Sequence, residues 1–196
     1  MREVEILVKV LDSKQKALRL LKKLKFKGAI KILDTYYYDP RRKNLQILNK
    51  RYPKEWFRIR NKENKVYIAY KKDYLNKGKW LYSDEYETEV KNTKIIKKII
   101  SSLGLKKFFQ IDNIKYTYLT KDYEVVLEDV NELGLFLEVE KLNVKDSDNI
   151  IKIRKSIDKF IDRLGINVSS ELHIGKPEMM LKSKSLNTKQ ISSMER

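Results

Sequence analysis

The sequence predicts an α+β protein, in which an antiparallel β-sheet carries amphipathic helices on one face. Apolar residues recur at helical spacing in three segments, and they alternate with polar residues in about eight others. Short polar connections between several alternating segments favour antiparallel hairpins. With 196 residues, the chain is long enough for one domain with a substantial hydrophobic core.

The three expected helices share one design: a polar residue that can cap the first turn, an apolar stripe, and a glycine after the last turn. In the first helix, Asp12 or Ser13 can serve as the cap, and Gly28 follows the stripe. Each stripe is expected to pack against the sheet. The expected helices span residues 12–25, 92–103 and 148–164.

Strict alternation marks the expected strands, because successive side chains of a strand point to opposite faces. The links "NKEN" (61–64) and "LTKD" (119–122) are short enough for hairpins. After Gly175 the apolar periodicity fades, so we expect a folded domain over residues 1–174 and a polar, mobile tail over 175–196. The expected strands span residues 2–10, 29–38, 55–61, 65–72, 80–90, 107–119, 122–130 and 135–143.

The chain carries 44 Lys and Arg against 27 Asp and Glu, a formal charge of +17. Such a charge attracts nucleic acid, nucleotides or anionic membranes, although the accompanying Asn and Ile indicate a general compositional bias. Cysteine is absent, which excludes disulfides and thiolate metal sites. Because no apolar run reaches about 18 residues and a strand follows Met1 directly, we expect no membrane span, no signal peptide and a cytoplasmic location.

The first strand has one apolar and one largely ionic face. In "EVEILVKV" (3–10), Glu3, Glu5, Leu7 and Lys9 share a face, opposite four apolar residues. A solvated outer face would explain a single such strand. However, several strands repeat the pattern with their charges segregated by sign, and if the sheet closes under its helices, these faces meet in a lumen. The repeated ionic residues are Arg58, Arg60, Lys71, Glu85, Glu87, Glu89, Lys115, Glu138 and Glu140.

A lumen that contains both signs of charge suits a triphosphate. Several Lys and Arg donors would hold the phosphate oxygens, and a divalent cation would neutralise the remaining charge. Mg²⁺ and Mn²⁺ prefer carboxylate oxygens and water as ligands. The sequence therefore indicates a metal-assisted triphosphate site.

Six motifs occur in the order typical of one known family. They are "EVEIL" (3–7), "DTYYYDP" (34–40), "WFRIR" (56–60), "AYKKD" (69–73), "SDEYETEV" (83–90) and "LEDVNELGLFLEVE" (127–140). In these motifs the chain resembles the CYTH superfamily, the triphosphate tunnel metalloenzymes, which include class IV adenylyl cyclases and thiamine triphosphatases. The resemblance implies a closed antiparallel eight-stranded β-barrel, the triphosphate tunnel, with helices outside.

The resemblance also implies roles for the ionic residues. It assigns divalent metal binding, by Mg²⁺ or Mn²⁺, to one group of carboxylates. It assigns phosphate binding to a second, cationic group, of which Lys9 and Lys71 are the expected catalytic residues. The expected metal ligands are Glu3, Glu5, Glu138 and Glu140, helped by Glu85 or Glu87, and the expected phosphate ligands are Lys9, Arg58, Arg60, Lys71 and Lys115.

The chain departs from the family pattern at three cationic positions. Leu7 stands where the family has a lysine, Ser83 or Asp84 where it has an arginine, and Asn113 where it has a further cation. The missing lysine is linked to hydrolysis, so an adenylyl cyclase-like reaction is favoured over a triphosphatase acting on thiamine triphosphate or tripolyphosphate. The departures also leave open a non-catalytic nucleotide or polyphosphate binder.

The high positive charge supports one further alternative, an RNA-binding protein that uses the basic helix at 12–25. A membrane partner is not expected. The sequence leaves the oligomeric state open between a monomer and a homodimer.

Overall fold

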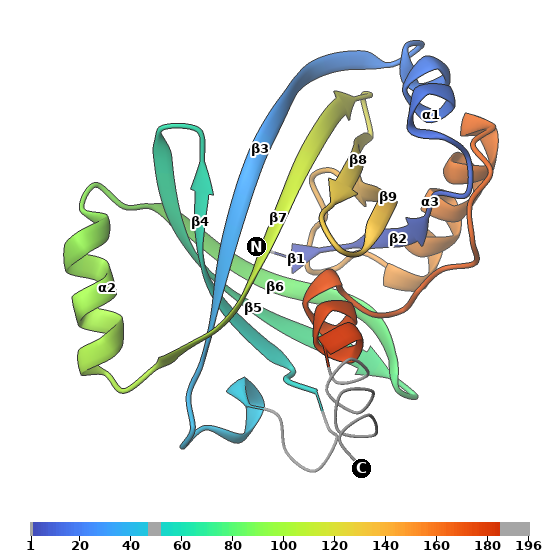
Figure 1. Ribbon diagram of the computed structural model, residues 1–196. Helices are drawn as coiled ribbons and strands as arrows, with labels where there is room; N and C mark the ends of the chain where they lie inside the picture. The colour runs from blue at the N-terminus through green and yellow to red at the C-terminus, as the bar shows by residue number, and fades with distance from the viewer. Residues whose placement is uncertain (1, 47–51, 185–196) are drawn as a thin grey trace, which may run out of the picture.

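The computed structural model describes residues 2–46 and 52–184, which form a strongly curved sheet with helices around it (Figure 1). The strands are β1 Arg2–Glu3, β2 Glu5–Lys9, β3 Lys25–Tyr38, β4 Glu55–Lys62, β5 Lys65–Asn76, β6 Lys79–Glu89, β7 Lys106–Leu119, β8 Tyr123–Val130 and β9 Gly134–Lys141. The helices are α1 Lys14–Leu21, the 3-10 helix η1 Lys43–Leu45, α2 Thr93–Ser102, α3 Ile150–Leu164 and a further helix over residues 176–184.

The sheet is a nearly closed antiparallel barrel, which confirms the predicted fold class. Its strand order is β1-β6-β5-β4-β3-β7-β8-β9-β2. The two ends of this order, β1 and β2, follow each other in the chain on either side of Val4. One pairs with β6 and the other with β9, so the N-terminal strand closes the barrel. The expected strand 2–10 is divided in this way, which gives nine strands where eight were expected.

The segment after α3 fills the gap that opens between β2 and β6. The backbone N–H of Leu172 donates to the carbonyl of Leu7 at 3.0 Å, and the N–H of Trp80 donates to the carbonyl of His173 at 3.3 Å. Where β2 and β6 separate, the Arg154 guanidinium donates to the carbonyls of Glu5 at 3.0 Å and Leu81 at 2.7 Å. These bonds satisfy backbone groups that the gap between β2 and β6 would otherwise leave unpaired.

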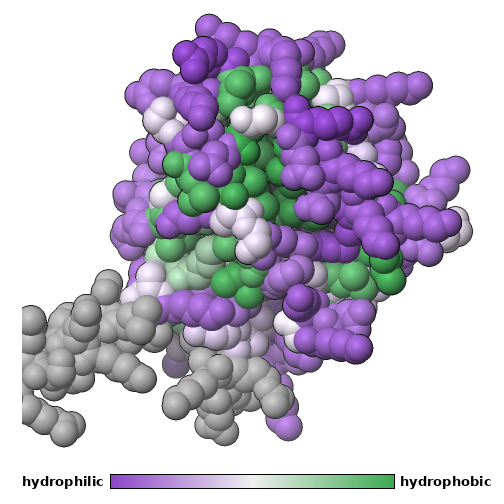
Figure 2. All heavy atoms as spheres, turned by 90° about the vertical axis from the view of Figure 1, so that its right-hand side faces the viewer, coloured by the Kyte–Doolittle hydropathy of each residue, from purple (hydrophilic) through white to green (hydrophobic). Residues whose placement is uncertain are grey.

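The larger core lies outside the barrel wall, where α1 and α3 pack on β2, β8 and β9. The Ser13 hydroxyl accepts from the N–H of Lys16 to cap α1, and Asn149 caps α3 in the same way. Figure 2 faces this side and shows hydrophilic side chains around a smaller hydrophobic area. The buried residues of this core are Val4, Ile6, Val8, Val10, Ala17, Leu21, Tyr118, Val125, Leu127, Leu137, Val139, Ile157, Ile161, Leu164 and Ile166.

A second core lies inside the barrel and closes one end of the lumen. The helix at 176–184 contributes Met180 and Leu181 to it, and it lies across the barrel opening in Figure 1. This helix contradicts the expected polar, mobile tail for residues 176–184; the tail residues 185–196 lie outside the described part of the chain. The cluster consists of Leu7, Tyr36, Trp56, Trp80, Phe109, Ile111, Val130, Phe136, Met180 and Leu181.

Two helix predictions need correction. The first helix ends at Leu21, and Gly28, the expected terminator, lies inside β3 at φ 148° beside a register shift between β3 and β7. The apolar stripe of α2 is only partly buried, because Ile100 is covered but Ile95 and Ile99 are about half exposed. Among the described residues, no helix is long and apolar enough to cross a membrane.

The inner core predicts a stability effect for the helix at 176–184. Met180 is 2% exposed, so Met180→Ala should lower the free energy of unfolding by about 2–5 kcal/mol through lost burial and a residual cavity. Chemical denaturation measures this change. Lys182→Ala, on the same helix with a 42% exposed side chain, is the control and should change it by about 0.5 kcal/mol or less. If Met180→Ala lowers the free energy of unfolding no more than the control does, the helix does not stabilise the barrel.

Candidate functional site

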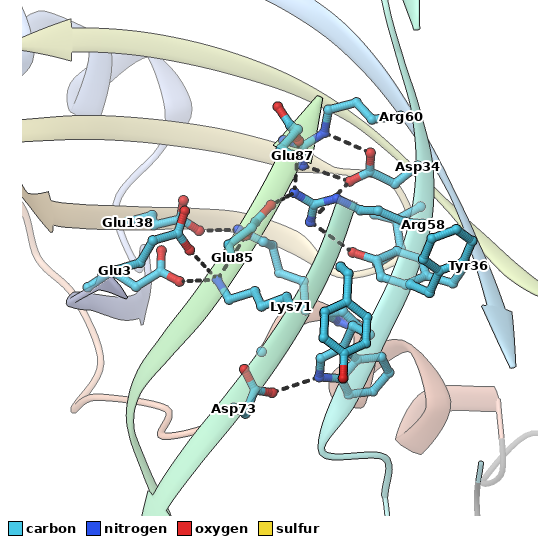
Figure 3. A pocket seen from close by; sticks show the side chains of 18 of the residues that line it. Glu3, Asp34, Tyr36, Arg58, Arg60, Lys71, Asp73, Glu85, Glu87 and Glu138 are labelled. Atoms are coloured by element: carbon cyan, nitrogen blue, oxygen red, sulfur yellow. Dashed lines mark hydrogen bonds and ion pairs between the residues drawn. The ribbon is translucent and has the colours of Figure 1, made fainter. Parts of the chain in front are cut away.

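The lumen holds a cavity of about 770 Å³ to which every strand of the barrel contributes. Strand alternation explains the composition of its wall, because β2, β8 and β9 turn their apolar face to the outer core and their ionic face inward. Figure 3 shows these side chains converging from the surrounding strands. The predicted site residues that line the cavity are Glu3, Glu5, Arg58, Arg60, Lys71, Glu85, Glu87, Lys115, Glu138 and Glu140.

Lys9 is the predicted site residue that the structure does not bring to the cavity. Its side chain is exposed at the end of β2. It shares a strand face with Glu5 and Leu7, but the apolar cluster occupies the lumen from Leu7 onward. The predicted catalytic and phosphate-binding roles of Lys9 therefore conflict with its position. Alternation identified the correct face but could not show where along the strand the cavity ends.

Two arginines form the cationic centre of the cavity. Arg60 donates to both carboxylate oxygens of Asp34, at 2.8 and 2.9 Å, and Arg58 donates to Glu85 at 2.7 Å. Burial alone would raise the pKa of Asp34, but the guanidiniums of Arg58 and Arg60 lower it to about 2. Asp34, which the sequence placed only within a motif, thus holds the Arg60 guanidinium, and it lies 3.9 Å from that of Arg58.

Lys71 occupies the boundary between the cationic and acidic sides. Its ammonium lies 2.9 Å from Glu3, 2.8 Å from Glu5 and 3.5 Å from Glu85, and 5.3 Å from the centre of the Trp80 ring. Burial opposes the ionised form of Glu85, but Arg58 and Lys71 lower its pKa to about 2. The lysine therefore links carboxylates from three strands.

A second cationic pair surrounds Glu128 on β8, which lies two strands from β3 in the sheet. Lys115 contacts Glu128 at 2.5 Å, and Lys176 contacts the other oxygen of Glu128 at 2.7 Å. Lys176 also forms an ion pair with Glu138. Sequence reasoning missed Glu128, although it alternates with Glu124 on β8, and it missed Lys176, for which the pattern of the C-terminal segment offered no signal.

The wall formed by β1, β2 and β9 has an excess of negative charge. Glu5 on β2 and Glu140 on β9 are directly opposite each other. Burial, and then the neighbouring charge of Glu138, raise the pKa of Glu5 to about 7. Burial, followed by the charges of Glu5, Glu3 and Glu138, raises the pKa of Glu140 to about 9. Too little positive charge lies near these two carboxyl groups to offset their burial, so their pKa values stay above the ordinary range.

The donor set suits a hard divalent cation, although it is not assembled around one point. Nine carboxyl groups but only five cationic side chains line the cavity, so a cation would relieve the imbalance. Within residues 2–46 and 52–184, no three Asp, Glu or His side chains converge as a ready metal site. Lys71 and Lys176 currently hold Glu3, Glu5 and Glu138, which accounts for this.

Comparisons with known proteins identify one family. The CYTH domain model matches residues 1–173. A Methanocaldococcus jannaschii protein, "Putative adenylate cyclase MJ0240", is 30% identical over 168 residues, which cover 85% of this chain and 91% of that protein.

Solved structures share the fold. The PH1819 protein of Pyrococcus horikoshii has a TM-score of 0.75 at 23% identity, covering 91% of this chain and 99% of that one. A Hippeastrum protein, described as a putative adenylyl cyclase with a dominant triphosphatase activity, has a TM-score of 0.62 at 13% identity, covering 92% and 96% of the two chains.

The raised pKa values of Glu5 and Glu140 predict how stability depends on pH. Because the folded protein holds these protons more tightly than the unfolded chain, the free energy of unfolding without metal should fall as pH rises from about 5 to 9. Added Mg²⁺ or Mn²⁺ competes with these protons, so it should raise the melting temperature more at pH 9 than at pH 6.

Thermal unfolding across this pH range, with and without metal, measures both effects. The double variant Glu5→Gln/Glu140→Gln removes the two titrating groups and should flatten the fall and reduce the metal effect. A double variant with an unchanged pH dependence would show that other groups cause it.

Proposed function

Because the chain belongs to the CYTH domain family, we propose that it is a divalent-metal-dependent enzyme that acts on a nucleoside or organic triphosphate, with an adenylyl cyclase-like reaction as the leading candidate. The observation that carries this proposal is the division of the lumen. A cluster of guanidinium and ammonium groups lies beside a surplus of carboxylates inside one enclosed cavity.

The cationic side is suited to phosphate oxygens. The Arg58 and Arg60 side chains are each 14% exposed, so their charges act in a partly desolvated environment where electrostatic attraction is strong. Lys71 and Lys115 add two ammonium groups on neighbouring parts of the wall. In the structure all four cations bind carboxylates, which a triphosphate could replace as the partner anion.

The acidic side is suited to the metal. Glu3, Glu5, Glu138 and Glu140 would hold Mg²⁺ or Mn²⁺, helped by Glu85 or Glu87 on β6. When bound, the metal supplies positive charge that neutralises phosphate oxygens and polarises the phosphorus under attack. Arg58 and Lys71 lie between the two sides and would orient the phosphate chain relative to the carboxylates.

Leu7 supports the cyclase over the hydrolase. Cyclisation needs attack by the ribose 3′-hydroxyl on the α-phosphorus, whereas hydrolysis needs a positioned water molecule. Leu7 is 2% exposed and packs in the apolar cluster, so it cannot donate to water or phosphate. The name of the Methanocaldococcus jannaschii relative agrees with this choice.

A triphosphatase is the second candidate. The Hippeastrum protein carries a cyclase name but is described as having dominant triphosphatase activity, so a cyclase name does not exclude hydrolysis in this fold. The cation cluster of this chain would bind the phosphates in either reaction.

Product analysis tests the proposal. Incubation with ATP and Mg²⁺ or Mn²⁺ should yield cyclic AMP and pyrophosphate, whereas a triphosphatase would release phosphate from ATP, thiamine triphosphate or tripolyphosphate. Arg58→Ala should lower the rate by about 10²–10³-fold through loss of a buried charge contact. Lys9→Ala, which changes an exposed cation outside the cavity, should leave it unchanged.

Absence of product and of metal-dependent triphosphate binding would overturn the proposed function. Equal losses in Arg58→Ala and Lys9→Ala would show that the reaction does not take place in this cavity.

A further inference from the structure

Glu124 is a carboxylate of the cavity wall to which the proposed function gives no role. It lines the cavity from β8 and lies directly opposite Glu140 on β9. Within the part of the chain that the structure describes, the Glu124 side chain forms no ion pair and no hydrogen bond. Glu138, on the same wall, pairs with Lys176 instead. A half-buried carboxylate without a partner is available to a ligand of the cavity.

Glu124 lies toward the open end of the lumen. On β8, Val130 belongs to the apolar cluster that closes the other end, and Glu124 is six residues away along the strand. At about 3.3 Å per residue, this separation is roughly 20 Å. On β4, Trp56 of the same cluster is only two residues from Arg58 and four from Arg60. Along its strand, Glu124 is therefore further from the closed end than either arginine.

A triphosphate held by the arginines would extend its organic group toward Glu124. The apolar cluster fills the closed end of the lumen, so the bulk of the ligand has room only on the open side. Polar groups at the closed end are also already used. The indole N–H groups of Trp56 and Trp80 donate to Asp73 and Ser83, at 2.7 and 2.9 Å.

A free carboxylate at this position can discriminate between ligands by the group at the end of their phosphate chain. A carboxylate accepts hydrogen bonds from amino and hydroxyl groups and attracts a positive charge, whereas it repels a phosphate oxyanion. Adenosine offers amino and hydroxyl donors, and thiamine offers a positively charged ring. Tripolyphosphate offers a further oxyanion at the same end. The sign of the Glu124 charge therefore favours the first two groups over the third.

We propose that Glu124 is a specificity-determining residue at the open end of the lumen. It selects triphosphates that carry an organic group with hydrogen-bond donors or a positive charge over inorganic polyphosphate. The inference rests on the proposed function, because it names the class of triphosphate that the same site takes. It assigns Glu124 neither metal binding nor a part in the chemical step.

Calorimetry on the full chain with Mg²⁺ tests the selection. It compares tripolyphosphate with two organic triphosphates, α,β-methylene-ATP and thiamine triphosphate. In Glu124→Gln the repulsion of an oxyanion is lost and the hydrogen bond to the organic group loses its charge. The dissociation constant of tripolyphosphate, divided by that of the organic ligand, should therefore fall by about 10-fold. A fall with α,β-methylene-ATP identifies hydrogen-bond donors as the selected feature, and a fall with thiamine triphosphate alone identifies the positive charge.

Two further variants control for the size of the side chain and for net charge. Glu124→Asp keeps the carboxylate and should retain most of the wild-type ratio. Glu89→Gln removes the same charge from β6, where Glu89 pairs with Lys65 at 3.0 Å and does not line the cavity. Its ratio should equal that of the wild type. An equal fall in Glu89→Gln and Glu124→Gln would show that only the net charge acts, and it would overturn the inference.

The individual affinities separate this failure from that of the proposed function. A wild type that binds none of the three ligands with Mg²⁺ would overturn both. A wild type that binds them with the same ratios as Glu124→Gln would overturn only the selection by Glu124. An equal loss of affinity for all three ligands in Glu124→Gln would also overturn the selection, because it would place Glu124 in phosphate or metal binding.

Discussion

The burial of ionised side chains inside the barrel is the constraint on which the rest of this structure depends. A single unpaired charge in such a lumen would cost several kcal/mol. Asp34 is therefore held by Arg58 and Arg60, and Glu128 by Lys115 and Lys176. Each of these carboxylates lies between two cations, and a second carboxylate, Glu85 or Glu138, completes the balance of charge in each cluster. The remaining carboxylates are not balanced in this way, and this asymmetry gives the cavity its chemistry.

The barrel interior can hold many charged side chains because the larger apolar core lies outside the barrel wall. Val8 on β2 and Leu137 on β9 are fully or almost fully buried outside the wall, in the core that α1 and α3 complete. The apolar faces of β2, β8 and β9 thus stabilise the fold, while their ionic faces are left for ligands. Side chains held on paired strands are also positioned more rigidly than side chains on loops. A Glu138 or Arg58 side chain therefore has little freedom to move away from the cavity.

Strand alternation was enough to predict most of the site, because a period of two residues determines which face each side chain shares. Arg58 and Glu138 face the cavity for this reason. Lys9 obeys the same rule but lies beyond the point where the apolar cluster fills the lumen, which depends on long-range packing. Lys176 could not be predicted, because its helix packs through Met180 and Leu181 into a cluster whose other members are distant in the sequence. The division of the first strand at Val4 likewise depends on its two partner strands.

Leu7 links the closure of the barrel to its charge distribution. A lysine at this position would place an ammonium group in the apolar cluster that holds Met180 and Leu181, where its desolvation would oppose the packing of the cluster. An apolar residue removes one cation from the wall but permits the helix that carries Lys176. Along β4, the side chains pass from Trp56 in the apolar cluster through Arg58 to Arg60, and along β6 they pass from Trp80 through Glu85 to Glu87. With the Trp56 and Trp80 end filled, the end marked by Arg60 and Glu87 is the remaining route along the barrel axis. The acidic side chains run the same way, from Phe136 in the cluster through Glu138 to Glu140 on β9, so a ligand that enters there meets arginines and carboxylates together.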